Sequence, residues 1–170
     1  MPLSPTILQT FQNFLDRIDR VVSWIIIAGM ATLTAVVVLQ VFFRYVLNDS
    51  LRWGWDIPRL CFIWVVLLSI PLGIRYNAHV GIDIVVQRFS KAMQRTVLIF
   101  NAFFMMVLSV AAAYYAVRLA HNTWDQDMPG IGLPVGLFYV GLVIGQIHTC
   151  LHIARILMTG ELSPDHLSET

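Results

Sequence analysis

Long apolar runs separated by short polar stretches dominate the chain. The run from Val21 to Phe43 contains no charged residue and exceeds the roughly 20 helical residues that a hydrocarbon layer requires. Three further runs follow, so the pattern predicts four membrane spans at about residues 21–43, 58–74, 96–117 and 131–155. Because lipid offers the backbone no hydrogen bonds, and because the runs are continuously apolar and do not alternate, we expect α-helices and not barrel strands.

The polar stretch before the first run has apolar residues at helical spacing. These residues are Leu8, Phe11, Leu15 and Ile18. Charged residues, including Asp16 and Asp19, lie among them. We interpret this stretch as a surface helix that leads into the membrane.

A second amphipathic stretch lies between the second and third runs. Its apolar side is formed by Ile82, Val85, Val86 and Phe89, while Arg88, Lys91 and Arg95 lie elsewhere on the turn. Such a basic helix suits an anionic membrane surface. The predicted fold class is therefore an all-α membrane protein of one domain, with four transmembrane helices and amphipathic interfacial helices.

The composition agrees with a protein that needs an apolar solvent. Of the 170 residues, 58% are hydrophobic and 12% are charged, whereas soluble domains carry roughly 25% charged residues. A net charge of +1 argues against nucleic acid as a partner, because phosphate binding needs a clustered excess of Lys and Arg. Cys61 and Cys150 both lie in apolar runs and predict neither a disulfide framework nor a metal site.

The distribution of Lys and Arg predicts that both termini lie in the cytoplasm. One side of the predicted topology holds seven of them: Arg17, Arg20, Arg75, Arg88, Lys91, Arg95 and Arg155. The other side holds four: Arg44, Arg52, Arg59 and Arg118. Cytoplasmic loops carry the excess of positive charge, which places the first side in the cytoplasm.

The densest polar cluster runs from Arg44 to Arg59, between the first two spans. If a helix begins near Asn48, then Arg52, Asp56 and Arg59 share one face of it, beside an apolar face that includes Trp53. One interpretation is an interfacial anchor with solvated charges. The other is a charged face that docks against another protein or a lipid headgroup.

The histidines give no firm ligand set. His79, in the loop after the second span, is typical of a capping or hydrogen-bonding residue. His148 and His152 are four residues apart and share a helix face, but they lack the intervening Glu of a zinc-protease motif. A b-type haem would need a histidine at matching depth in another span, and none stands there. We therefore expect no metal and no cofactor.

No Asp or Glu stands in the middle of any predicted span. Ion-coupled transporters usually place ionisable or unwound polar elements near the membrane midplane. This chain is therefore a poor candidate for transport on its own.

Three motifs resemble the small membrane subunit of the tripartite ATP-independent periplasmic (TRAP) transporters. The first is Arg44-Tyr45-Val46-Leu47-Asn48, which ends the first span. The second comprises Trp53, Asp56 and Arg59 at the start of the second span, and the third comprises Gly73, Arg75, His79 and Asp83 after it. The family often has two adjacent acids after its Trp, whereas this chain has Trp55 and Asp56 there.

The resemblance implies an accessory role and not an enzyme. In that family a periplasmic binding protein captures an organic anion, and a large membrane subunit moves it with a sodium gradient. The small subunit packs beside the large one, stabilises its scaffold and binds no substrate. The expected partners are thus the large subunit, the binding protein and lipids of the bacterial inner membrane, with no nucleic acid.

By the same resemblance, the cargo would be a carboxylate or a sialic-acid-like anion. Arg44, Asn48, Trp53, Asp56 and Arg59 would shape the periplasmic connection, and His79 and Asp83 the cytoplasmic one. Two other functions stay open: a b-haem membrane anchor of a respiratory enzyme, and a small exporter that works as a homodimer. The exporter would normally need an acid in its first span, which this chain lacks there.

Overall fold

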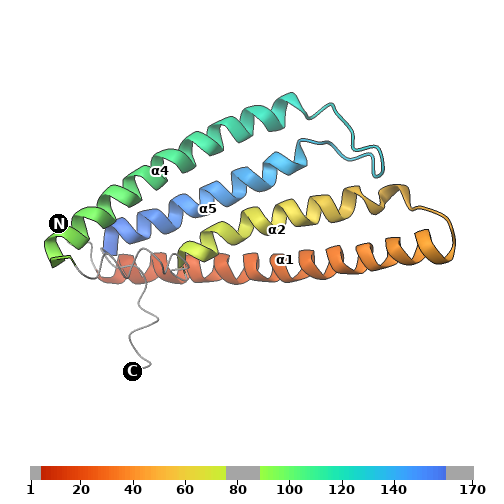
Figure 1. The fold of residues 1–170 in the computed structure, drawn as a ribbon. Coiled ribbons are helices and arrows are strands. Elements are labelled where there is room, and N and C mark those ends of the chain that lie inside the picture. The colour runs from red at the N-terminus through yellow and green to blue at the C-terminus, as the bar shows by residue number, and fades with distance from the viewer. Residues whose placement is uncertain (1–4, 76–88, 160–170) are drawn as a thin grey trace, which may run out of the picture.

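Four long helices make up almost all of the structure, a computed structural model that describes residues 5–75 and 89–159 (Figure 1). They are α1 (Pro5–Val46), α2 (Asp56–Arg75), α4 (Lys91–Asn122) and α5 (Leu137–Thr159). A single 3-10 turn, η1 (Arg52–Gly54), precedes α2. All four helices are long and apolar enough to cross a membrane, which confirms the predicted all-α membrane fold.

The helices lie side by side in the order α1, α2, α5, α4, and not as a closed bundle (Figure 1). Contacts are extensive between α1 and α2, between α2 and α5, and between α5 and α4, whereas α1 touches α5 only slightly. In the most apolar part of α1 only 6% of the residues are buried within the chain, against 39% in α5. Lipid or another protein must therefore cover most of the apolar surface.

Small residues allow the helices to approach closely. On α4, Ala102, Ser109 and Ala116 recur every seven residues and are all buried. On α5, Gly141 lies against the Trp64 ring and Gly145 against the backbone carbonyl of Leu67. Close packing through small residues is the usual way in which membrane helices associate.

A proline explains why the Leu67 carbonyl faces its neighbour. Pro71 is four residues further along α2 and is fully buried. Because proline has no N–H, the carbonyl of Leu67 receives no hydrogen bond from that position within the helix. An ideal Cβ on Gly145 would lie 2.7 Å from the Leu67 oxygen, so only glycine fits there without a shift.

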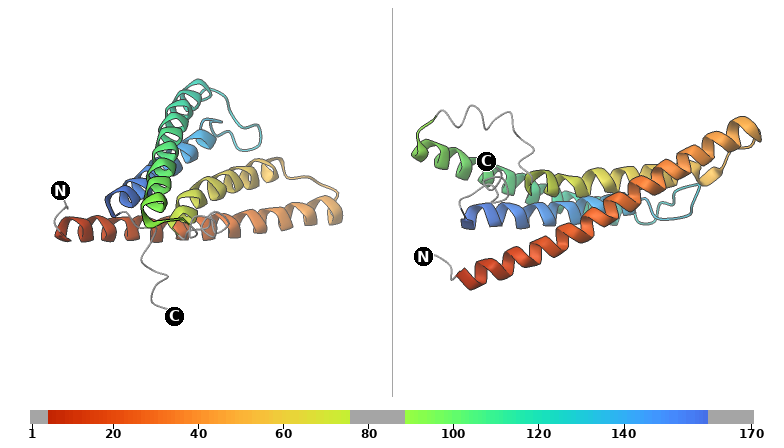
Figure 2. Two further views of the ribbon diagram at one scale, coloured as in Figure 1. Left: turned by 60° about the vertical axis from the view of Figure 1, so that its left-hand side comes forward. Right: turned by 90° about the horizontal axis from the view of Figure 1, so that it is seen from below.

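The helix bounds differ from the predicted spans in informative ways. The predicted N-terminal surface segment and the first span are one continuous helix, α1, with Leu15 buried in its first half. The fourth helix begins at Leu137 and not at residue 131, because residues 123–136 form a folded connection closed by the bond from the Val135 N–H to the Gln126 carbonyl. Figure 2 shows this connection at the end of the molecule opposite the described chain ends.

The predicted basic helix lies mostly outside the described residues. Within them, Ser90 begins a new helix, because its side chain accepts a hydrogen bond from the Met93 N–H at the N-terminus of α4. Lys91 and Arg95 therefore belong to α4, which follows a non-helical break at residues 89–90.

Candidate functional site

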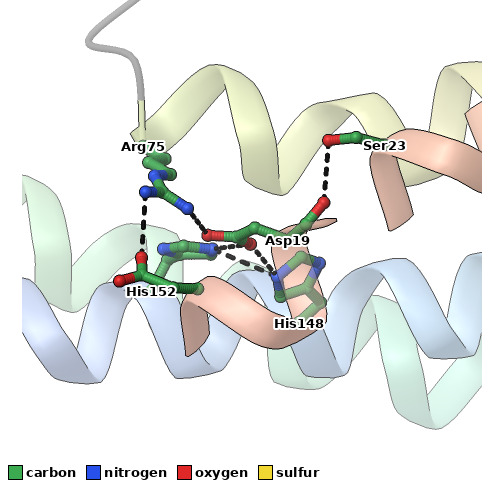
Figure 3. Close-up of polar contacts among 6 residues, drawn as sticks. Asp19, Ser23, Arg75, His148 and His152 are labelled. Atoms are coloured by element: carbon green, nitrogen blue, oxygen red, sulfur yellow. Dashed lines mark hydrogen bonds and ion pairs between the residues drawn. The ribbon is translucent and has the colours of Figure 1, made fainter. Parts of the chain in front are cut away.

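A buried cluster of charged and ring side chains joins three helices near the C-terminal ends of α2 and α5 (Figure 3). Asp19 comes from α1, Arg75 from the last residue of α2, and His148 and His152 from α5. Asp19, His148 and His152 are each at most 3% exposed. Groups of this kind are seldom buried without partners, so the contacts among them decide what the cluster can do.

Each carboxylate oxygen of Asp19 has its own partners. Oδ2 accepts a hydrogen bond from the Arg75 guanidinium. Oδ1 lies 2.7 Å from Nε2 of His148 and 3.0 Å from Nε2 of His152. The two Nε2 atoms are themselves 3.1 Å apart. Three polar atoms from two helices thus converge on one point.

A second carboxylate holds Arg75 from the solvent side. Asp16 lies 2.9 Å from the guanidinium, and its side chain is 48% exposed, against 4% for Asp19. Asp16 and Asp19 are three residues apart on α1 and so lie on neighbouring turns of one face. His148 and His152, four residues apart on α5, likewise lie on neighbouring turns of one face, and that face is directed toward Asp19.

At the opposite end of the molecule, polar side chains form hydrogen bonds with backbone groups. Oδ2 of Asp56, at the start of α2, accepts a bond of 2.7 Å from the Gly130 N–H in the connection between α4 and α5. Gly130 is pressed so closely against Arg52 that a Cβ would collide with the Arg52 carbonyl. The first and third connections therefore form one packed unit.

Two indole groups add to this unit. With its amide oriented to satisfy both partners, Gln40 donates to the Gly54 carbonyl at 2.6 Å and accepts from Nε1 of Trp55 at 3.1 Å. Nε1 of Trp64 donates to the Leu137 carbonyl at 3.0 Å, which ties α2 to the first residue of α5. Gln40, the one strongly polar side chain of the first predicted span, thus anchors the loop that follows it.

A model of the DctQ component of tripartite ATP-independent periplasmic transporters matches residues 33–160. The chain belongs to this family. The match spans α2, α4, α5 and the last part of α1, and it includes the packed unit of the first and third connections, while Asp16 and Asp19 lie before it.

Relatives of this chain come from several bacteria. A protein of Haemophilus influenzae assigned as a TRAP transporter small permease is 22% identical, over 81% of this chain and 83% of its own length. The C4-dicarboxylate TRAP transporter small permease protein DctQ of Rhodobacter capsulatus is 24% identical, over 69% of this chain and 54% of its own. The isethionate TRAP transporter permease protein DctMQ of Oleidesulfovibrio alaskensis is 23% identical, over 78% of this chain and only 22% of its own.

The motifs of the first connection have structural roles in this chain. Asn48 has a φ of +49°, and the Asp49 N–H after it bonds to the Phe43 carbonyl at 3.2 Å. Asparagine tolerates this left-handed conformation better than most residues, so it can end α1. Arg44 is exposed and stacks over its neighbour Tyr45. Trp53, in η1, is half-buried.

The predicted charged face is not formed as one helix face in the structure. Arg52 belongs to η1, and α2 begins only at Asp56. Within residues 5–75 and 89–159, Asp56 forms no ion pair with Arg52 or Arg59 and bonds instead to Gly130. Arg59 lies over the Phe138 ring, 5.1 Å from its centre. Within the chain, the Asp56 carboxylate thus binds a backbone N–H and neither of the two arginines.

Two other predicted residues, His79 and Asp83, lie outside the described residues. Sequence reasoning placed His148 and His152 on one helix face but did not bring Asp19 to them, because Asp19 stands beside Arg17 and Arg20 in a stretch that is typical of a solvated surface. One signal was available: Leu15, Asp19 and Val22 fall on one helix face, and all three are buried.

Replacing Asp56 by alanine is expected to loosen the connection between α4 and α5. Hydrogen–deuterium exchange at Gly130 should become about tenfold faster or more, since a hydrogen bond to a charged group contributes about 1.5–3 kcal/mol. Asp56→Asn keeps an acceptor oxygen and should change exchange much less. Asp49→Ala, which removes an exposed carboxylate in the same loop, is the matched control. Equal exchange in all four proteins would contradict the role given to Asp56.

Proposed function

We propose that this chain is the accessory subunit that packs against the large transport subunit of a sodium-driven importer for organic anions and stabilises its scaffold. The observation that carries the proposal is the family match over residues 33–160. The row of four helices supports it, because such a row leaves broad apolar surfaces for lipid and for a large membrane partner.

A longer relative supports a membrane partner of this kind. The isethionate permease protein DctMQ contains the region similar to this chain in only 22% of its length, so the remainder of that chain is other permease sequence. We infer that the region described here packs against a corresponding large subunit. A periplasmic binding protein would deliver the cargo to that complex.

The cargo is proposed to be an organic anion, either a carboxylate or a sialic-acid-like acid. The names of two relatives, for C4-dicarboxylate and for isethionate, are consistent with anionic cargo. The small subunit itself would not select it. In residues 21–43, 60–74 and 96–117 there is no Asp, Glu, Lys or Arg at all, so these segments offer no charge to bind an anion or couple an ion.

The b-haem anchor is not supported. A haem held between two helices would need a free histidine from each. His148 and His152 both come from α5 and both face Asp19. His121, the remaining histidine in the described part of the chain, lies at the far end of α4.

The proposed site of action is the bacterial inner membrane, with both termini in the cytoplasm. The seven Lys and Arg on the side of the termini, against four on the other side, support this orientation. A reporter that fluoresces only in the cytoplasm should be bright when fused to Thr170. A dark fusion with an active periplasmic reporter at the same position would reverse the topology.

Uptake in reconstituted vesicles tests the function. The chain alone should give no sodium-dependent uptake of an organic anion above empty vesicles. The chain with the large subunit and the binding protein should give uptake, and the large subunit without this chain should give less. Uptake by the chain alone, or full uptake without it, would show that the accessory role is wrong.

A further inference from the structure

We propose that Asp19, His148 and His152 form a binding site for one divalent transition-metal ion of the zinc type. The ligand atoms would be Oδ1 of Asp19 and Nε2 of each histidine. The proposal concerns the side chains of this chain alone and is independent of the transported anion and of the large subunit. The sequence alone indicated no metal, because a third ligand from another helix was not recognised.

The geometry of the three atoms fits such an ion. They are separated by 2.7, 3.0 and 3.1 Å and belong to two different helices. The centre of this triangle is about 1.7 Å from each atom, so an ion slightly off the plane can lie about 2.0–2.1 Å from all three. Those are the ordinary distances from zinc to imidazole nitrogen and to carboxylate oxygen.

Hydrogen bonds alone bring the three atoms of the triangle into a crowded arrangement. Each neutral imidazole carries at most one proton on Nε2, and an ionised carboxylate carries none. If both Nε2 protons point at Oδ1 of Asp19, that oxygen accepts two hydrogen bonds and the two N–H groups are crowded side by side, with their nitrogens 3.1 Å apart. If one points at the other ring instead, two lone pairs face each other at Asp19. A metal ion accepts all three lone pairs at once, which removes this conflict.

The charges around the triangle also favour a cation. With both rings neutral, Asp16 and Asp19 contribute −2 and Arg75 contributes +1, which leaves −1 on these five side chains. Arg75 binds the other oxygen of Asp19 and so turns Oδ1 toward the histidines. A supporting contact of this kind orients a ligand and is typical of metal sites.

The ligand set determines the chemical class of the ion. Two imidazoles and one carboxylate suit zinc and its neighbours in the first transition row, whereas calcium and magnesium prefer oxygen ligands only. The spacing of four residues between His148 and His152 places two ligands on one helix face, as in known zinc sites. The ion would join α1 to α5, two helices that otherwise touch little.

Metal binding by the purified full-length chain tests the proposal. The affinity tag should be free of histidine, and the protein should be treated with chelator and then titrated with Zn2+ against a chromophoric competitor. We expect one Zn2+ per chain. His148→Gln and His152→Gln should each weaken binding by more than the roughly 10–100-fold that loss of a supporting contact costs.

The matched control is His121→Gln, which removes an exposed histidine at the far end of α4. It should bind Zn2+ as the wild type does. Wild-type protein that binds no Zn2+ would overturn the proposal. The three side chains would then be joined by hydrogen bonds only. Equal affinity in the wild type and His148→Gln would also overturn it, since the ion would lie elsewhere.

A second measurement covers the case in which a histidine variant does not fold. Wild-type protein loaded with Co2+ should show the intense visible absorption of a low-coordinate nitrogen and oxygen site. One equivalent of Zn2+ should abolish that absorption. A spectrum equal to that of Co2+ in buffer would contradict the proposed site without any variant.

Discussion

Asp19→Asn is expected to lower the free energy of unfolding by about 3–5 kcal/mol, because it removes one partner from a buried ion pair. Asparagine keeps the shape of the side chain but carries no charge to face the Arg75 guanidinium or the two imidazoles. The carboxylate is only 4% exposed, so water cannot compensate for the loss. Denaturation by titration with SDS in mixed micelles, with chelator present, measures the change in the absence of metal.

Asp16→Asn provides a closely matched comparison. Asp16 binds the same guanidinium from the same helix, but its side chain is 48% exposed. An exposed ion pair contributes only about 0–1 kcal/mol, so this variant should remain close to the wild type. If both variants lost the same stability, burial would not be the reason for the importance of Asp19.

Gly145→Ala is expected to destabilise the contact between α2 and α5 by about 1–3 kcal/mol, the usual cost of overpacking. The test is whether alanine at this position lowers or raises the free energy of unfolding. In an open helical position alanine stabilises relative to glycine by about 0.5–1 kcal/mol. Here the new Cβ would lie 2.7 Å from the Leu67 oxygen, which belongs to the backbone and cannot rotate away.

Gly141→Ala is the internal comparison for this prediction. Its Cβ would lie 3.1 Å from Nε1 of Trp64, an atom of a side chain that can shift by a few tenths of an ångström. The loss should therefore be smaller than for Gly145→Ala. Both variants are measured in the same SDS titration. A Gly145→Ala variant that is more stable than the wild type would contradict the packing argument.

The spans could be predicted from the sequence because their signal is local. Residues 21–43 carry no charge, and a run of that length has few alternatives to a membrane helix. The ends were harder to place. Residues 131–136 are apolar enough to extend the fourth span, yet they are folded into a connection through bonds such as that from the Met128 N–H to the Leu133 carbonyl.

The candidate sites likewise combine short motifs, which the sequence indicates, with contacts between residues far apart in the sequence, which it does not. The motif around Asn48 and Asp56 is short and could be recognised, although the partner of Asp56, Gly130, is 74 residues away along the chain. The contact between Asp19 and His148 spans 129 residues, and no local pattern indicates it. These residues meet because α1 and α5, which lie on either side of α2 in the row, approach each other at this one point.

The part of α1 from Asp19 to its end matches the thickness of a typical bilayer. From Asp19 to Val46 the helix rises 27 residues, which corresponds to about 40 Å at 1.5 Å per residue. A typical bilayer measures about 40–45 Å across when its headgroups are included. The Asp19 cluster and the loop after Val46 can thus lie at the headgroups of opposite leaflets. A much thinner membrane would force α1 to tilt or to extend its charged turns beyond the membrane surface. Hydrophobic mismatch would therefore affect both the Asp19 cluster and the loop after Val46.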